Sequence, residues 1–479
     1  MSTGSAAVIG GGVIGGGWAA RFLLNGWNVK VFDPDPEARR KIDEVIRNAR
    51  QSLPMLYERS LPDEGELGFA MSVAEAVDGA DYIQESVPER LGLKRKVYAQ
   101  IESAAPDVPL GSSTSGFKPS DLRMGLDSGA RLFVAHPFNP VYLLPLVELV
   151  SGGGDSGILE SASRILTSIG MRPLVVRAEI DAHIADRFLE AVWREALWLI
   201  KDDIATTGEV DEAIRLGFGL RWAQMGLFET YRIAGGEGGM AHFVEQFGPA
   251  LAWPWTRLMD VPELTPELVK KIGDQSDAQS EGQSVRELES LRDRNLVALL
   301  RALKREGSAA GRVIADHEAN LGGEDMGRIP MITVRRMVPS DWTDYNGHMN
   351  ESRYGQVFSD AADAVLAHVG AGPDYVSAGR SFFTVSTKID YLLETHAGET
   401  VQVVTRVLLG EGKKLKLRHE LRRASDGSVL ATCEQFLLHV SLESRKSCDP
   451  ERPVGDAIKA LADAHGQLAF ERTGESSQS

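Results

Sequence analysis

Two side chains in this sequence have the types and spacing that proton transfer requires. His136 follows the apolar run 131–135, and Glu148 stands within the apolar segment 146–150. A carboxylate inside an apolar strand is costly unless it has a partner, and a histidine is a suitable one. The carboxylate would fix the imidazole tautomer and raise its basicity, which leaves the other ring nitrogen to accept a hydroxyl proton. The alternative is a structural core histidine and a solvent-facing Glu148.

A glycine motif near the N-terminus predicts a binding site for a nucleotide cofactor. It consists of Gly10, Gly11, Gly12, Val13, Ile14 and Gly15. The spacing of Gly10, Gly12 and Gly15 fits the motif G-x-G-x-x-G. An apolar strand at 7–9 precedes the motif and a helix at 18–24 follows it, which is the arrangement found in dinucleotide-binding folds. The apolar segment 27–32 ends in Asp33, a carboxylate placed for the adenosine ribose hydroxyls and unfavourable to a 2′-phosphate. We therefore expect NAD as the cofactor, with hydride transfer to its nicotinamide as a proton leaves toward His136.

Composition limits the classes of protein that fit. The chain has 479 residues, 43% of them hydrophobic, and a net charge of −16, which argues against nucleic acid or an anionic membrane as partner. Its two cysteines, Cys433 and Cys448, indicate neither a disulfide framework nor a zinc site, so we expect no metal. No apolar run reaches membrane length and no secretory signal is evident, so we expect a cytoplasmic protein.

The pattern along the chain predicts three parts. Residues 1–182 alternate strands and helices, which predicts an α/β Rossmann domain with a doubly wound parallel sheet. Residues 183–321 predict a helical domain, and 322–329 has the composition of a linker. Residues 330–470 predict an α+β domain, one helix against long antiparallel strands, before a disordered tail at 471–479. The expected helices are 184–200, 216–233, 288–305, 351–369 and 454–466, and the late strands are 332–338, 382–390, 400–409, 414–422 and 429–439.

The first part resembles the 3-hydroxyacyl-CoA dehydrogenase family over roughly residues 5–260. The resemblance rests on the glycine motif with Asp33, the segments Glu85-Ser86-Val87-Pro88-Glu89 and Ser112-Ser113-Thr114-Ser115, the block His136-Pro137-Phe138-Asn139-Pro140, and Glu148. It implies that His136 is the general base, oriented by Glu148, and that Ser115 contacts the substrate hydroxyl or the histidine. It also implies that Glu89 and Lys94 line the cofactor cleft, that Asn139 binds substrate, and that the helical domain dimerises.

One departure from that family concerns the substrate. The family's helical domain opens with an asparagine–arginine pair, whereas this chain has Asp186 before Arg187. Asp186 and Trp193 share a helical face, and a carboxylate with nearby tryptophans favours a cationic ligand, although most tryptophans are core residues. The subgroup that the chain resembles is that of the L-carnitine dehydrogenases, which implies L-carnitine as substrate.

Residues 341–350 carry a second motif, Asp-Trp-Thr-Asp-Tyr-Asn-Gly-His-Met-Asn. It resembles the hotdog-fold thioesterases of the 4-hydroxybenzoyl-CoA type, whose sites form between two protomers. The resemblance implies that Asp344 attacks the thioester or activates water, and that His348 and Asn350 position water or shape the loop. Asp360 and Asp363 on the following helix are alternatives for the acid. Lys414, Lys416 and Arg418 share a strand face that suits either CoA phosphates or solvent.

The fused arrangement resembles bifunctional L-carnitine dehydrogenase/betainyl-CoA thioesterases, and implies betainyl-CoA as the second substrate and a homodimer. Three alternatives stay open at this point. A 3-hydroxyacyl-CoA dehydrogenase fused to a short-chain acyl-CoA thioesterase is the nearest, and a sugar-acid dehydrogenase is the second. A non-catalytic binding protein is the third, although Ser115, His136 and Glu148 are all present.

Overall fold

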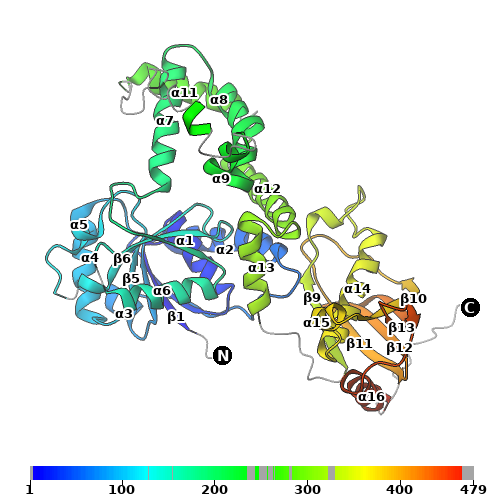
Figure 1. Cartoon of the computed structure of the whole chain (residues 1–479). Coiled ribbons are helices and arrows are strands. Elements are labelled where there is room, and N and C mark those ends of the chain that lie inside the picture. Colours follow the sequence, from blue (N-terminus) through cyan, green and yellow to red (C-terminus); the bar gives the residue numbers. More distant parts are fainter. Residues whose placement is uncertain are drawn as a thin grey trace, which may run out of the picture. The chain divides into compact units, whose positions relative to one another are not determined.

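The computed structural model describes residues 4–466 except 128, 154, 235–242, 247–255, 257–262, 264, 280–282 and 322–329. The predicted linker and the predicted tail therefore lie outside the described residues. The chain divides into two compact units (Figure 1). The first comprises Met1–Leu56 with Leu61–Asn320, and the second comprises Tyr57–Ser60 with Leu321–Ser479.

An eight-stranded sheet forms the centre of the first unit, in the order β3-β2-β1-β4-β5-β6-β7-β8. Its strands are β1 (Ser5–Ile9), β2 (Asn28–Phe32), β3 (Leu67–Phe69), β4 (Tyr82–Glu85), β5 (Leu110–Ser112), β6 (Leu132–Pro137), β7 (Leu146–Val150) and β8 (Arg172–Val176). The helices around it are α1 (Val13–Leu23), α2 (Ala38–Ser52), α3 (Val73–Val77), α4 (Leu91–Ala104), α5 (Pro119–Arg123) and α6 (Ser156–Ser168). Alternate residues of β1 face opposite layers: Ala7 and Ile9 join the core with α3 and α4. The fold is the Rossmann type that the sequence predicts.

One strand pair departs from the predicted parallel sheet. β6 and β7 run antiparallel, because the connection 138–145 is too short for the crossover that parallel strands need. This reversal places His136 directly opposite Glu148 in the register of the two strands.

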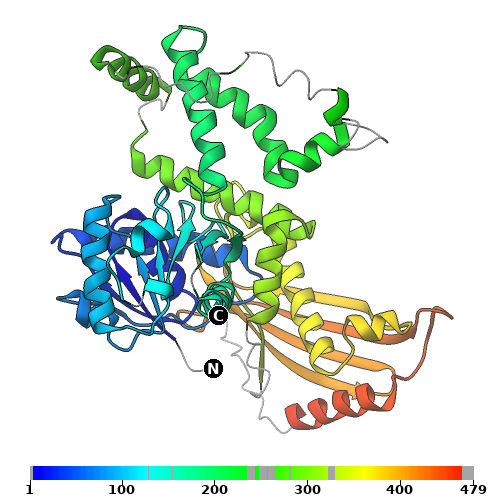
Figure 2. The same ribbon diagram turned by 60° about the vertical axis from the view of Figure 1, so that its left-hand side comes forward.

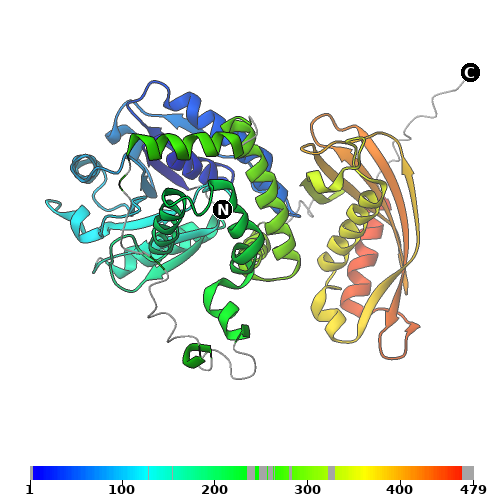
Figure 3. The ribbon, with the colours of Figure 1, turned by 90° about the horizontal axis from the view of Figure 1, so that it is seen from above.

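The helical part of the first unit follows β8. It contains α7 (Ala185–Lys201), α8 (Thr207–Ala213), α9 (Gly219–Ala234), α11 (Pro266–Gln279), α12 (Val285–Arg305) and α13 (Ala309–Asn320). Residues 214–218 form a π-helical turn before α9, so the helix predicted at 216–233 begins later than expected. α12 returns to the Rossmann sheet and lies against α2 (Figure 3). Arg286 of α12 pairs with Glu44 of α2.

The second unit is a single antiparallel sheet around one long helix (Figure 2). The strand order is β10-β13-β12-β11-β9, and β14 (Lys446–Ser447) pairs with β13. The strands are β9 (Met331–Met337), β10 (Arg380–Tyr391), β11 (Thr400–Glu411), β12 (Lys414–Arg423) and β13 (Val429–Ser441). α14 (Glu351–His368) buries Val357, Phe358 and Ala361 against the sheet, and α15 (Pro373–Ser377) and α16 (Arg452–Gly466) complete the unit. This is the hotdog arrangement that the sequence predicts. No helix among the described residues has the length and apolarity to span a membrane.

Candidate active sites

The geometry of the glycine motif suits a bound dinucleotide. A Cβ at Gly10 would lie 2.6 Å from the Ser86 backbone, and φ there is +108°. A Cβ at Gly15 would lie 1.8 Å from the carbonyl oxygen of Gly10, so helix and strand pack too closely for any side chain. At Gly12, by contrast, nothing stands within 4 Å of that position. The two tight glycines shape the turn, and the open one leaves room for a pyrophosphate at the N-terminus of α1.

Asp33 stands where β2 ends, facing the same turn. One carboxylate oxygen accepts a hydrogen bond from the Gly11 amide at 2.5 Å, and the other accepts one from the Asp35 amide at 2.7 Å. Because the side chain stays partly exposed, it remains accessible to a ribose.

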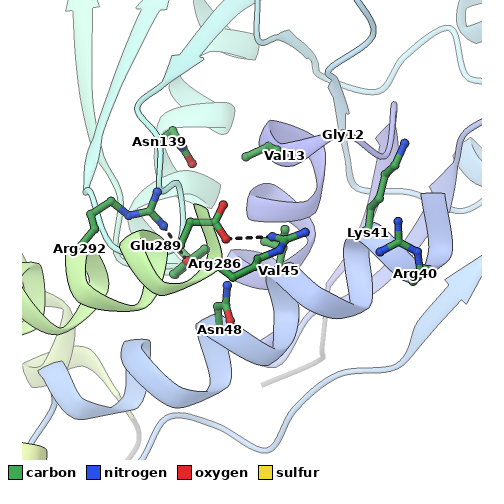
Figure 4. A pocket seen from close by; sticks show the side chains of 11 residues that line it. Gly12, Val13, Arg40, Lys41, Val45, Asn48, Asn139, Arg286, Glu289 and Arg292 are labelled. Carbon is green, nitrogen blue, oxygen red and sulfur yellow. Dashed lines mark hydrogen bonds and ion pairs between the residues drawn. The ribbon is translucent and has the colours of Figure 1, made fainter. Parts of the chain in front are cut away.

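A cavity of about 370 Å³ opens beside Gly12 and Val13 (Figure 4). Its cations come from two helices: α2 contributes Arg40 and Lys41, and α12 contributes Arg286 and Arg292. Asn139, from the loop after His136, also lines this cavity. The cavity therefore joins the glycine motif, the loop after β6 and the helical part of the unit.

A buried polar network lies at the ends of β4 and β5. It joins Glu85, Glu89, Lys94, Tyr98, Ser112 and Thr114. Lys94 is fully buried and donates to Glu85 at 2.8 Å, while its distance to the Glu89 carboxylate is 3.3 Å. Lys94 therefore lies inside the network, whereas the side chain of Glu89 is 41% exposed. A buried lysine needs such carboxylate partners to keep its charge.

His136 and Glu148 form a buried pair. Nδ1 of His136 lies 3.0 Å from a carboxylate oxygen of Glu148, which is fully buried. The other oxygen of Glu148 accepts hydrogen bonds from the amides of Ile184 and Ala185, each at 3.0 Å. Burial by itself raises the pKa of Glu148, but the hydrogen bonds from His136 and these amides hold it below its ordinary value. An ionised Glu148 keeps the proton of His136 on Nδ1 and leaves Nε2 as the basic nitrogen.

Asp186 stands on the other side of the same imidazole. Its carboxylate lies 3.6 Å from Nε2 of His136, so the ring stands between two carboxylates. Burial raises the pKa of Asp186, against the lowering effect of His136. Trp193, two helical turns further along α7, is 62% exposed.

Ser115 and His183 have different surroundings. Ser115 is exposed in the turn after β5, and its side chain makes no hydrogen bond to another residue in the described part of the chain. His183, which the sequence analysis did not select, is fully buried with its ring 5.7 Å from that of His136. It and Ala182 both have φ between +50° and +60°, a strained conformation for non-glycine residues that occurs mostly at functional sites. The only sequence signal was a histidine just before the amphipathic helix.

In the second unit, the Asp344 loop is a closed turn at the start of α14. The Asp344 amide donates to the His348 carbonyl at 2.9 Å, and the Gly347 amide donates back to the Asp344 carbonyl at 3.0 Å. The Asp344 carboxylate accepts from the Asn346 amide and stays half-buried. Asn350 caps α14, since its side-chain oxygen accepts from the Ser352 amide at 3.0 Å. The turn thus presents Asp344 and His348 next to a helix N-terminus.

Asp360 and two cations of the basic strand face have other partners. Asp360 forms an ion pair of 2.8 Å with the buried Arg336, although burial raises the pKa of this carboxyl. Lys416 and Arg418 both pair with Glu434, at 2.8 and 3.5 Å.

Comparison with known proteins assigns each part. The family model described as 3-hydroxyacyl-CoA dehydrogenase, NAD binding domain, matches residues 5–180, and the C-terminal domain of the same family matches 183–271. A thioesterase-like superfamily model matches 338–458. A solved 5-formyl-3-hydroxy-2-methylpyridine 4-carboxylic acid 5-dehydrogenase shares the fold of 63% of this chain and 99% of its own, at 24% identity and a TM-score of 0.54. The first unit is thus an NAD-binding dehydrogenase and the second a thioesterase-like domain.

Two relatives refine this assignment. The L-carnitine dehydrogenase/betainyl-CoA thioesterase of Ruegeria pomeroyi is 58% identical over 97% of both chains. The L-carnitine dehydrogenase of Oceanobacillus iheyensis is 51% identical over 61% of this chain and 96% of its own. This chain belongs to the family of the L-carnitine dehydrogenase/betainyl-CoA thioesterases.

Proposed function

We propose that this protein oxidises L-carnitine to 3-dehydrocarnitine with NAD in its first unit, and hydrolyses betainyl-CoA to glycine betaine and CoA in its second. The observation that supports the first activity best is the placement of Asp186 at 3.6 Å from Nε2 of His136. In carnitine the quaternary ammonium group lies one carbon beyond the carbinol carbon. A hydroxyl that donates to Nε2 therefore brings the ammonium within reach of Asp186.

NAD, when bound, accepts the hydride from the carbinol carbon. The glycine motif and Asp33 would hold its adenosine and pyrophosphate, with the cations of the adjoining cavity nearby. Nε2 of His136 takes the hydroxyl proton, and Glu148 stabilises the imidazolium that results. Ser115 and Asn139 lie in the turns after β5 and β6, at the strand ends where a doubly wound sheet binds its ligands.

Asp186 selects the cation in this proposal. Two opposite unit charges about 4 Å apart attract by about 4 kcal/mol at an effective dielectric constant of about 20, before the cost of desolvation. Exposed Trp193, on the same helix, offers an aromatic face of the kind that binds quaternary ammonium groups.

The test follows NADH formation with L-carnitine, D-carnitine, 3-hydroxybutyrate and 3-hydroxybutyryl-CoA, each with NAD and with NADP. We expect a rate with L-carnitine and NAD. Asp186→Asn should lower kcat/KM for L-carnitine by more than about tenfold, mainly through KM, while NADH affinity stays unchanged. The proposal fails if only the CoA ester is oxidised, or if Asp186→Asn alters L-carnitine and 3-hydroxybutyrate oxidation equally.

For the second unit we propose Asp344 as the acid that attacks the thioester or activates water. The N-terminus of α14 would polarise the thioester carbonyl, and His348 would position water. Asn350 contributes by shaping the loop, because its side chain caps α14. Asp344→Asn should abolish release of CoA from betainyl-CoA and leave carnitine oxidation unchanged. Asp456→Asn, on an exposed carboxyl of α16, is the matched control.

We also propose that the protein is a cytoplasmic homodimer. β10 is an edge strand with apolar side chains about half exposed, among them Phe383 at 49% and Val385 at 58%. Long exposed apolar edges are usually paired in the native assembly. Both cysteines are free, in keeping with a reducing compartment.

A further inference from the structure

A second cluster of polar side chains in the thioesterase-like unit shares only His348 with the functions proposed above. His348, Glu394 and His396 each offer a ligand atom, and these three atoms lie within 4.8 Å of one another. Nε2 of His348 is 3.6 Å from a carboxylate oxygen of Glu394, and the two imidazole rings are 4.8 Å apart. This is the one such group with metal-ligand chemistry among the described residues.

The backbone holds the two histidines side by side. They pair across an isolated antiparallel bridge, and the Met349 amide donates to the Thr395 carbonyl at 2.8 Å. The Asp344 turn fixes the other side of His348. Two of the three side chains therefore start from positions that are already set, which lowers the ordering cost of binding an ion.

The tautomer of His396 is also set. Its Nδ1 lies 3.1 Å from the carbonyl oxygen of Gly347, and a carbonyl can only accept, so Nδ1 carries the proton. Nε2 of His396 then has a free lone pair. A ligating histidine commonly donates its other ring N–H to a backbone carbonyl in this way, which fixes both ring orientation and tautomer.

The spacing and exposure suit a small transition-metal ion. Two ligands bound tetrahedrally to Zn²⁺ at about 2.0–2.1 Å stand about 3.3 Å apart, close to the 3.6 Å between His348 and Glu394. Glu394 is 65% exposed and can rotate to close the remaining gap. Two histidines and one carboxylate leave a fourth position open to water, as in catalytic zinc sites.

We propose that His348, Glu394 and His396 form a binding site for one divalent transition-metal ion of the Zn²⁺ class, next to the Asp344 loop. The site does not depend on the thioesterase activity being correctly assigned. Because His348 is part of the Asp344 turn, an ion bound there restrains that turn.

Equilibrium dialysis of the full chain, free of any histidine tag, against Zn²⁺ tests the site, with metal and protein measured in the same sample. Co²⁺ then replaces Zn²⁺, since its visible absorption reports nitrogen and oxygen ligands in a tetrahedral field. We expect one ion per chain in the wild type and in His368→Ala, which removes an exposed histidine outside the cluster. His396→Ala should weaken binding more than about tenfold and abolish the Co²⁺ bands.

Glu394→Gln provides a second variant, because an exposed side chain can be changed without loss of folding. It should also weaken binding, while NADH binding by the first unit stays unchanged in every variant. Equal stoichiometry in wild type and His396→Ala, or binding below about one ion per ten chains in the wild type, overturns the proposal.

Discussion

Glu148 joins two parts of the first active site. One oxygen holds Nδ1 of His136, and the other accepts from the first amides of α7. We predict that Glu148→Gln retains the contact to α7 through its side-chain oxygen but turns an N–H group toward Nδ1. The proton of His136 then moves to Nε2, the nitrogen that must act as base, and kcat/KM for L-carnitine should fall by roughly 10²–10⁴-fold.

Steady-state kinetics measure this loss, and NADH fluorescence checks that the cofactor still binds. Lys201→Gln, at the far end of α7, is the control. Activity of Glu148→Gln within about threefold of the wild type would contradict the proposed role, because an orienting carboxylate is needed for the basic tautomer.

Single residues also show which parts of the site can be predicted from the sequence and which cannot. The pairing of His136 with Glu148 could be predicted, because a carboxylate in an apolar strand needs a partner. His183 could not, because its place beside His136 results from two consecutive residues with positive φ, which no residue type there signals. The family resemblance implies that Lys94 lines the cofactor cleft, whereas the structure shows it fully buried, with the Glu85 carboxylate compensating its charge.

At the scale of elements, the hydrophobic pattern placed most helices and strands correctly. The helix predicted at 351–369 is α14, and the strand predicted at 429–439 is β13. The direction of β7 was not available from that pattern, because strand periodicity is the same in parallel and antiparallel pairs. The direction of β7 depends on the short connection 138–145. Because β7 runs antiparallel to β6, His136 lies opposite Glu148.

A buried polar chain crosses four strands of the second sheet. Thr333 on β9 contacts Thr405 on β11, Thr405 contacts Nδ1 of His419 on β12, and Nε2 of His419 contacts Gln435 on β13. Burial lowers the pKa of His419 to about 4, from an ordinary value of 6.5. As the pH falls, the unfolded chain therefore protonates this histidine at a higher pH than the folded chain does. The stability that depends on neutral His419 is fully present above pH 6.5 and is lost as the pH falls from about 6.5 to 4, by about 3 kcal/mol in all.

Chemical unfolding of the full chain at pH 7 and pH 5 measures this effect, with hydrogen exchange used to assign the transition to residues 330–466. We expect the unfolding free energy of that unit to drop by about 2 kcal/mol between the two pH values. His419→Gln should lower stability at pH 7 and reduce the pH dependence. An equally steep dependence in His419→Gln would assign it to other groups.

The exposed edge strand β10 carries a prediction about assembly. Val385→Lys places a charge in the middle of its apolar row, and should convert the proposed dimer to a monomer in analytical ultracentrifugation. Met71→Lys, which changes an equally apolar side chain that is 87% exposed in the first unit, should leave the mass unchanged. An unaltered dimer in Val385→Lys would move the interface to another surface, such as the exposed Leu216 and Phe228 of the helical part.

The whole molecule consists of two units with separate cores and separate candidate sites. All the residues of the proposed oxidation site lie in the first unit, and an L-carnitine dehydrogenase that aligns over 96% of its own length covers 61% of this chain. We therefore predict that a chain ending at residue 321 oxidises L-carnitine with kcat/KM within about twofold of the full chain. Its activity on betainyl-CoA should be absent.

The one segment that complicates this division is 57–60, which belongs to the second unit by its contacts although it precedes most of the first. Glu58 pairs with the buried Arg336 at 2.7 Å, and Arg336 also pairs with Asp360. Removing residues 322–479 leaves Glu58 in water at little cost, since it is 41% exposed already. The converse fragment, 330–479, keeps Asp360 but loses Glu58 as an ion-pair partner of Arg336, and should be less stable than the same unit in the full chain. In it, Arg336→Met should recover part of the loss. If the first fragment instead loses carnitine oxidation while still binding NADH, the second unit contributes to the oxidation site, and the assignment of one reaction to each unit is wrong.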